Sequence, residues 1–132
     1  VMFDDRWKNI ELRLQETDDV TVEMDSDKMR QVFINILKNS ADALSGRENG
    51  KMRIEIRKTG NDAAVSFRDN GPGVEQGSFQ RIKQPFFTTK QKGSGLGLAI
   101  SERIVKGHKG TMKIKSDGAA YTEVVITIPL SG

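Results

Sequence analysis

Three glycines in alternation, Gly93, Gly95 and Gly97, lead directly into an apolar, helix-favouring segment at residues 98–100. Closely spaced glycines let backbone N–H groups approach a polyphosphate, and the start of a helix adds the positive end of its dipole. The stretch lacks the Gly-Lys-Ser/Thr ending of a P-loop, and its glycine spacing differs from the dinucleotide-binding pattern. Phosphate binding and a flexible turn before a helix are therefore both open interpretations.

Two asparagines, Asn35 and Asn39, lie in the middle of a predicted helix, and Asp42 continues the same stripe at positions i, i+4 and i+7. Asparagine is a poor helix former because its side chain competes for backbone hydrogen bonds, so the pair costs stability that alanine would not. One interpretation is a solvated helix edge. We favour a site for a hard cation beside phosphates, because Mg²⁺ typically takes only one or two oxygen ligands from the protein.

Asp69 ends a predicted strand, and alternation places it on the same face as Val65 and Phe67, which should be buried. Burial of a carboxylate without hydrogen bonds costs several kcal/mol, so a cation or the donors of a ligand should meet it. The amino group of a purine fits, because the turn at residues 70–73 leaves room for a flat ring. The alternative is an aspartate that only initiates the turn.

Residues 74–92 lose the apolar periodicity of the rest of the chain, which predicts a mobile lid. The lid contains Pro-Phe-Phe-Thr-Thr-Lys at residues 85–90. At least one of the two phenylalanines is expected to anchor the lid to the core. Lys90 lies three residues before Gly93, so it is either a solvated charge or a cation that reaches the same phosphates; we favour the second interpretation.

The elements that must position these residues follow from apolar periodicity. Alternation at residues 10–14 and 20–24 predicts two strands with a tight turn between them, and a cap at residues 25–27 begins a long amphipathic helix that ends at Ser45. The remaining predictions are a hairpin of strands at residues 52–57 and 63–69, a helix from the glycine stretch to Gly107, and strands at residues 111–116 and 121–128. This order predicts an α/β fold.

Composition limits the possible classes of protein. The 132 residues form one predicted domain, and the absence of cysteine excludes disulfides and thiolate metal sites. A net charge of +3, with one Trp and one Tyr, gives little support to nucleic-acid binding. No segment reaches the apolar length of a membrane span, and the first residues do not resemble a signal peptide. The single histidine, His108, has no sequence neighbour that could serve as base or second ligand, so we predict a structural role.

Four separated motifs, in this order, resemble the catalytic, ATP-binding domain of sensor histidine kinases. The motifs are an N box at residues 35–40, a first glycine box at residues 69–73, an F box at residues 85–90 and a second glycine box at residues 93–98. The sequences of these motifs are most similar to those of nitrogen-regulation-type kinases with a short lid, here about residues 74–96. The resemblance implies a two-layer α/β sandwich, with a mixed, mostly antiparallel sheet covered by helices on one face. Gyrase, mismatch-repair and heat-shock-chaperone ATPases of the same GHKL superfamily share this Bergerat fold.

The resemblance also implies roles for individual residues. Asp69 would accept the adenine amino group, and Gly71 and Gly73 would shape the adenine pocket. Asn39 would be the Mg²⁺ ligand, and Asn35 would line the phosphate side. The remaining nucleotide-binding residues implied are Thr88, Thr89, Lys90, Gly93, Ser94, Gly95, Leu96, Gly97 and Leu98, with Lys90 near the terminal phosphate. Asp42 departs from the lysine or arginine of many relatives, so we assign it no phosphate contact.

The implied activity is transfer of the γ-phosphoryl group of ATP to a histidine on a separate dimerisation domain, and onward to a response-regulator aspartate. Asn35 occupies the position where the related ATPases carry a glutamate, and an amide cannot act as a general base, so efficient hydrolysis is not expected. The parent is expected to be a homodimer with this domain in the cytoplasm, without nucleic-acid or direct membrane contact. Two alternatives are open: a binding module in which ATP only reorders the lid, and a slow ATPase.

Overall fold

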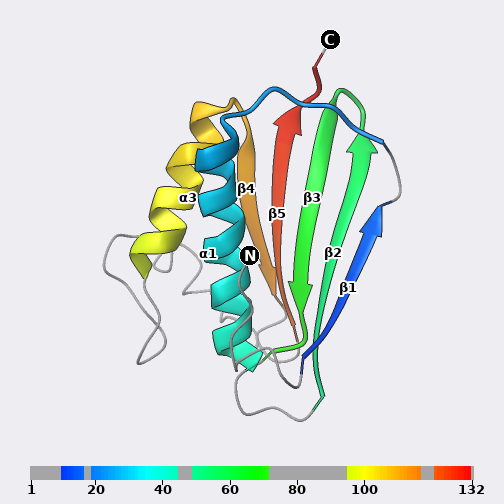
Figure 1. Cartoon of the computed structure of the whole chain (residues 1–132), viewed down its shortest axis with the longest axis vertical. Coiled ribbons are helices and arrows are strands. Elements are labelled where there is room, and N and C mark those ends of the chain that lie inside the picture. Colours follow the sequence, from blue (N-terminus) through cyan, green and yellow to red (C-terminus); the bar gives the residue numbers. More distant parts are fainter. Residues whose placement is uncertain (1–9, 17–18, 45–48, 72–94, 117–120, 132) are drawn as a thin grey trace.

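The computed structural model describes residues 10–16, 19–44, 49–71, 95–116 and 121–131. Its elements in chain order are β1 (Ile10–Glu16), α1 (Ser26–Leu44), β2 (Gly50–Thr59), β3 (Asp62–Asp69), α3 (Gly95–Gly107), β4 (Thr111–Ser116) and β5 (Thr122–Pro129) (Figure 1). Apart from the first predicted hairpin, these elements lie where apolar periodicity predicts them.

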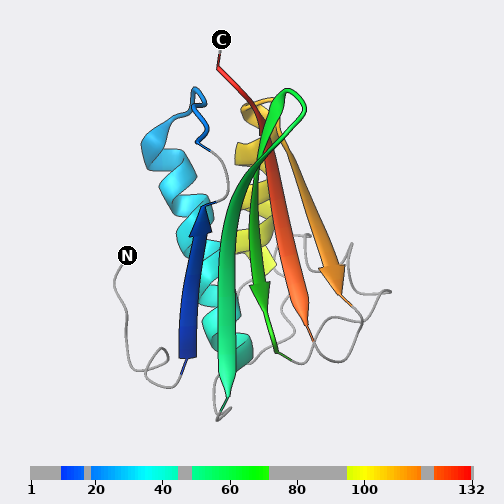
Figure 2. The same cartoon turned by 90° about the vertical axis from the view of Figure 1, so that its right-hand side faces the viewer.

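The strands form one five-stranded sheet in the order β1-β2-β3-β5-β4. β1 runs parallel to β2, and the other three neighbouring pairs are antiparallel. Both helices lie on the same side of this sheet, behind it in Figure 2. The predicted two-layer α/β sandwich with a mixed, mostly antiparallel sheet is therefore confirmed.

The hairpin of β2 and β3 shows how local signals set the register. Only Gly60 and Asn61 separate the two strands, and Gly60 has a φ of 61°, a conformation that glycine adopts without steric cost. Beyond this turn Thr59 lies opposite Asp62 and Met52 lies opposite Asp69. The register therefore places Asp69, the last residue of β3, beside the start of β2.

The strand predicted at residues 20–24, and with it the first hairpin, is wrong. This segment is described and contains no strand, whereas β1 pairs in parallel with β2, with Ile10 opposite Gly50. Parallel neighbours need a long crossover, which α1 supplies. Val22 is half-buried and packs against the core, so the apolar alternation here reflects packing and not a ladder of strand hydrogen bonds.

The core lies between the helices and the inner face of the sheet. The buried apolar side chains of this core are Met29, Val32, Ile36, Leu37, Leu44, Met52, Phe67, Leu98, Val105, Met112, Ile114, Val124, Ile126 and Ile128. The rings of Phe33 and Phe67 join the layers, with centroids 5.6 Å apart. Each fully buried side chain of this size contributes about 1.5–3 kcal/mol, so the packing fixes both helices against the sheet.

Polar contacts join the start of α1 to the end of α3. Asp25 caps α1, because its Oδ1 accepts a hydrogen bond from the N–H of Lys28 at 3.1 Å. The backbone N–H of Asp25 donates to Nε2 of His108 at 2.9 Å, and Nδ1 of the same ring lies 2.8 Å from the carbonyl oxygen of Ile104. The structural role predicted for His108 is confirmed: it links the end of α3 to the start of α1.

No helix in the described ranges is long and apolar enough to cross a membrane.

Candidate functional site

Three elements converge at the end of the sheet opposite the His108 contact. They are the second half of α1, the end of β3 and the start of α3 (Figure 1). The helices run antiparallel, because Asp25 at the start of α1 meets His108 after the end of α3. The predicted asparagines, Asp69 and the part of the glycine stretch that begins α3 at Gly95 therefore lie toward the same end of the molecule.

Asp69 is buried, as its position in the alternation predicts, with 5% of its surface exposed. It faces inward from the last position of β3, between Met52 on β2 and Thr122 on β5. Its Oδ1 accepts a hydrogen bond from the N–H of Gly71 at 2.9 Å. This bond turns the backbone back on the carboxylate and fixes the orientation of an acceptor group at the edge of the core.

Glycine is required at position 71 because the backbone here lies close to Asp69 and to α1. A Cβ added here would lie 2.8 Å from Oδ1 of Asp69 and 3.1 Å from Cβ of Ala43 on α1. The turn after β3 thus packs directly on the second half of α1 without a side chain in between. The turn is expected to leave room for a flat ring, whereas at Gly71 itself Asp69 and Ala43 already occupy the space that a side chain would take.

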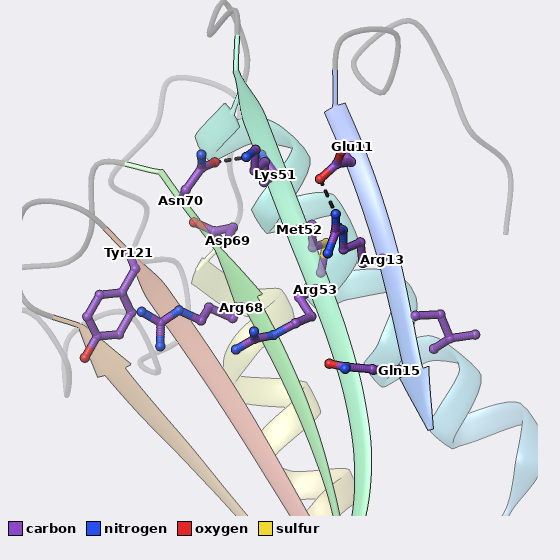
Figure 3. Close-up of a pocket in the computed structure, with 11 residues that line it drawn as sticks. Glu11, Arg13, Gln15, Lys51, Met52, Arg53, Arg68, Asp69, Asn70 and Tyr121 are labelled. Atoms are coloured by element: carbon purple, nitrogen blue, oxygen red, sulfur yellow. Dashed lines mark hydrogen bonds and ion pairs between the residues drawn. The ribbon is translucent and has the colours of Figure 1, made fainter. Parts of the chain in front are cut away.

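Asn70 was expected only to take part in the turn, yet it anchors that turn to β2 (Figure 3). Its Oδ1 accepts from the N–H of Lys51 at 2.7 Å, and its Nδ2 donates to the carbonyl oxygen of Asn49 at 2.8 Å. Its own N–H donates to the carbonyl oxygen of Lys51 at 3.1 Å. The available signal was the residue type, because an asparagine that directly follows a strand commonly bonds nearby backbone groups.

Asn35, Asn39 and Asp42 are all half-buried, which confirms that their stripe borders the core of the protein. Nδ2 of Asn35 lies 3.4 Å from Oγ of Ser101, a fully buried hydroxyl on α3. Ser101 was missed, although a serine on the apolar face of an amphipathic helix is itself a signal of a buried polar contact. Asn39 lies one turn after Asn35 and one turn before Ala43, hence between the contact with α3 and the contact with Gly71.

The glycine stretch opens α3 at Gly95, so Gly95, Leu96 and Gly97 form the first turn of a 13-residue helix. Unpaired backbone N–H groups and the helix dipole favour an anion at such a start. Leu98 is 9% exposed and its side chain belongs to the core, so any contact between Leu98 and a phosphate would come from its backbone. The other residues predicted for the site, Gly73, Thr88, Thr89, Lys90, Gly93 and Ser94, lie outside the described residues.

The fit of a metal ion rests on the chemistry of the available donors. Within the described ranges no group of three or more His, Cys, Asp or Glu side chains could hold a metal. A half-buried amide such as Asn39 supplies one hard oxygen, which suits Mg²⁺ that receives its other ligands from phosphates and water. The donors therefore fit a metal that arrives with a polyphosphate.

Comparison with known proteins gives concordant matches. The family described as histidine kinase-, DNA gyrase B-, and HSP90-like ATPase matches residues 24–132. Sporulation kinase C of Bacillus subtilis (strain 168) is 39% identical over 121 residues, which cover 92% of this chain and 28% of that protein. The chain thus spans less than a third of this curated relative.

Solved structures agree with this match. The nucleotide-free catalytic domain of histidine kinase ThkA superposes with a TM-score of 0.82 at 31% identity, covering 94% of this chain and 81% of that chain. Full-length ShkA in complex with AMPPNP superposes with a TM-score of 0.81 at 25% identity, covering 94% of this chain and 26% of that chain.

Proposed function

We infer, because this chain belongs to the family of histidine kinase-, DNA gyrase B-, and HSP90-like ATPases and is similar to histidine kinase catalytic domains, that it binds ATP and phosphorylates a histidine. The acceptor histidine belongs to a separate dimerisation domain of the parent protein. The observation that carries the proposal is the buried carboxylate of Asp69, held in place by Gly71 beside α1.

Asp69 is the group we assign to the adenine ring. A buried, oriented carboxylate is a strong acceptor, and the adenine amino group is a donor that fits it. Gly71 brings the turn against both Asp69 and Ala43, and it would shape the edge of the adenine pocket without projecting a side chain into it. Gly73 is proposed to line the same pocket.

The phosphates are assigned to the space between α1 and α3. Backbone N–H groups at residues 93–98 would bind them, with Thr88, Thr89 and Lys90 on the lid side and Asn35 on the α1 side. Asn39 is the proposed Mg²⁺ ligand. The metal would neutralise phosphate charge, which is the chief requirement of phosphoryl transfer.

Transfer to a histidine is favoured over hydrolysis by the chemistry of Asn35. Its amide is engaged with Ser101 and has no basic group to take a proton from water. A neutral imidazole nitrogen needs less help, because it already carries a nucleophilic lone pair. This nitrogen bonds to the γ-phosphorus, the bond from that phosphorus to the β–γ bridging oxygen breaks, ADP leaves, and the imidazole N–H proton passes to solvent.

The proposed partners follow from this reaction. The dimerisation domain supplies the acceptor, and a response-regulator receiver domain takes the phosphoryl group onward to an aspartate. The use of ATP as substrate supports a cytoplasmic location for the domain, and we propose that the parent protein acts as a homodimer.

The test is a transfer assay with γ-labelled ATP. The chain alone should bind AMPPNP but gain no label, and addition of the parental dimerisation domain should give an acid-labile, base-stable phosphohistidine on that domain. Label on the lone chain would contradict the proposal. ATP-dependent binding of the dimerisation domain without transfer would instead support a binding module, and steady phosphate release without acceptor would support a slow ATPase.

A further inference from the structure

The outer face of the sheet, opposite the helices, carries a row of arginines. The register places Arg13 on β1 opposite Arg53 on β2, and Arg53 opposite Arg68 on β3. Figure 3 shows the three side chains on the near side of the sheet, with both helices behind it. We call Arg13, Arg53 and Arg68 the arginine row.

This row is unfavourable for the isolated sheet. Neighbouring strands lie about 4.8 Å apart, and like charges directly opposite each other destabilise a sheet. The first acidic neighbour, Glu11, is in contact with Arg13, whose Nε lies 3.4 Å from Oε2 of Glu11. Glu55 pairs with Arg57 of its own strand. Within the described ranges, no acid on the outer face is paired with Arg53, at the centre of the row.

Arg53 and Arg68, the other two arginines of the row, are placed to bind an anion from outside the chain. Arg53 is exposed and makes no ion pair or hydrogen bond through its side chain within the described ranges. The guanidinium of Arg68 lies over the ring of Tyr121, 4.1 Å from its centroid, which holds the group flat. Glu123, opposite Arg68 on β5, is bound by the hydroxyl of Ser66 at 2.5 Å. A planar, preoriented guanidinium binds a carboxylate in two-point fashion.

The row lies in a hollow of about 760 Å³. Its lining includes the arginine row with Lys51, Gln15, Glu11 and Tyr121, and it extends to Asp69 and Asn70 at the end of β3. Basic side chains therefore line a concave surface that no element in the described part of the chain covers (Figure 2).

We propose that the arginine row is a docking surface for an acidic segment of a polypeptide. Carboxylates spaced by one or two residues along that segment would pair with Arg53 and Arg68 and relieve the repulsion within the row. The occupant is a polypeptide and not a nucleic acid or a membrane, because Glu11, Glu55 and Glu123 interrupt the basic charge. A uniform polyanion would meet these acids, whereas a segment of mixed composition avoids them. The arginine row itself contains no residue assigned to the nucleotide, and its side chains lie on the face of the sheet away from the helices.

The test measures binding of a fluorescein-labelled peptide of alternating glutamate and alanine to the chain, by fluorescence anisotropy at low salt. We expect saturable binding with amide shifts in the NMR spectrum centred on the arginine row. Arg53→Glu and Arg68→Glu should each weaken binding by about tenfold or more. Lys113→Glu makes the same charge change on the same face at β4 and should weaken binding by less than about twofold.

Arg53→Gln is the milder companion variant, and circular dichroism together with AMPPNP binding verifies that every variant is folded. Three results would overturn the proposal. They are lack of saturable peptide binding, an equal loss for Lys113→Glu and Arg53→Glu, and tighter binding of an oligodeoxynucleotide or an anionic lipid vesicle than of the peptide at the arginine row.

Discussion

The two ends of the α1 and α3 pair are built in opposite ways. At one end the helices are joined by protein groups alone, with His108 accepting from the N–H of Asp25 and contacting the carbonyl oxygen of Ile104. At the other end lie a buried carboxylate, a turn packed on Ala43 and a helix that begins with glycine. One end serves to hold the helices, and the other presents polar groups between them.

This difference teaches how a small fold separates stability from binding. Changes at the His108 end should alter the free energy of unfolding and leave nucleotide affinity nearly intact. Changes at the Asp69 end should act mainly on affinity. Each prediction below tests whether the two ends can be separated in this way.

Asp69→Asn should have the largest effect, a loss of about 100-fold in nucleotide affinity, because a donor would replace the acceptor that faces the adenine amino group. Isothermal titration calorimetry with AMPPNP measures the change. The matched control is Asp62→Asn at the other end of β3, which should bind normally. Near-normal binding by Asp69→Asn would remove the adenine assignment.

A pair of glycine substitutions should divide the two ends most directly. A Cβ at Gly110 would lie 2.4 Å from the carbonyl oxygen of Thr127, so Gly110→Ala should lower the free energy of unfolding by about 2–3 kcal/mol. Gly71→Ala, which crowds Asp69 and Ala43, should reduce nucleotide affinity more than stability. Chemical denaturation and calorimetry give the two quantities for each variant.

Gly107→Ala is the control for this pair, because an added Cβ would meet nothing within 4 Å. It should leave both quantities close to those of the parent sequence. If Gly71→Ala and Gly110→Ala changed stability and affinity in the same proportion, the separation of the two ends would fail.

His108→Ala should cost about 1–2 kcal/mol of stability, since the N–H of Asp25 loses its acceptor and the carbonyl oxygen of Ile104 loses its ring contact. Nucleotide affinity, extrapolated to the fully folded protein, should change by less than about threefold. A larger loss of affinity would mean that the His108 contact also sets the geometry of the distant site.

Lys109→Gly should have the smallest effect, a gain in stability of about 0.5–1 kcal/mol. Lys109 has a φ of 62°, a conformation that costs a side chain with a Cβ but not glycine. Thermal unfolding measures the gain, and Lys113→Gly, in the middle of β4, should instead destabilise the protein. A destabilised Lys109→Gly variant would contradict this account of the backbone at the end of α3.

The sequence predicts best those features whose causes are local. The β2 and β3 hairpin, the cap at Asp25 and the burial of Asp69 follow from turn residues and alternation over a few positions. Alternation alone does not identify the strand with which another strand pairs. The predicted pairing of residues 20–24 with β1 is therefore wrong, and the partner of β1 is β2, which follows α1.

Contacts between distant segments were harder to predict. Asn35 meets Ser101 across 66 positions of sequence, and His108 meets Asp25 across 83. Residue type signals that such polar groups need partners, but the partner is set by how the helices pack. The roles assigned to Asn39 and to residues 88–94 stay predictions, because they depend on a ligand.

The edge position of β1 has a consequence for the order in which the protein opens. Among the strands that the structure describes, β1 has only β2 as a neighbour, and the side chain of Leu14 near its end remains 71% exposed. Its pairing also closes a long chain loop, with Ile10 opposite Gly50, whereas β2 and β3 close over a two-residue turn. Amide hydrogens of β1 should therefore exchange through fraying well before those of β3, so this edge strand should open while the centre of the sheet stays paired.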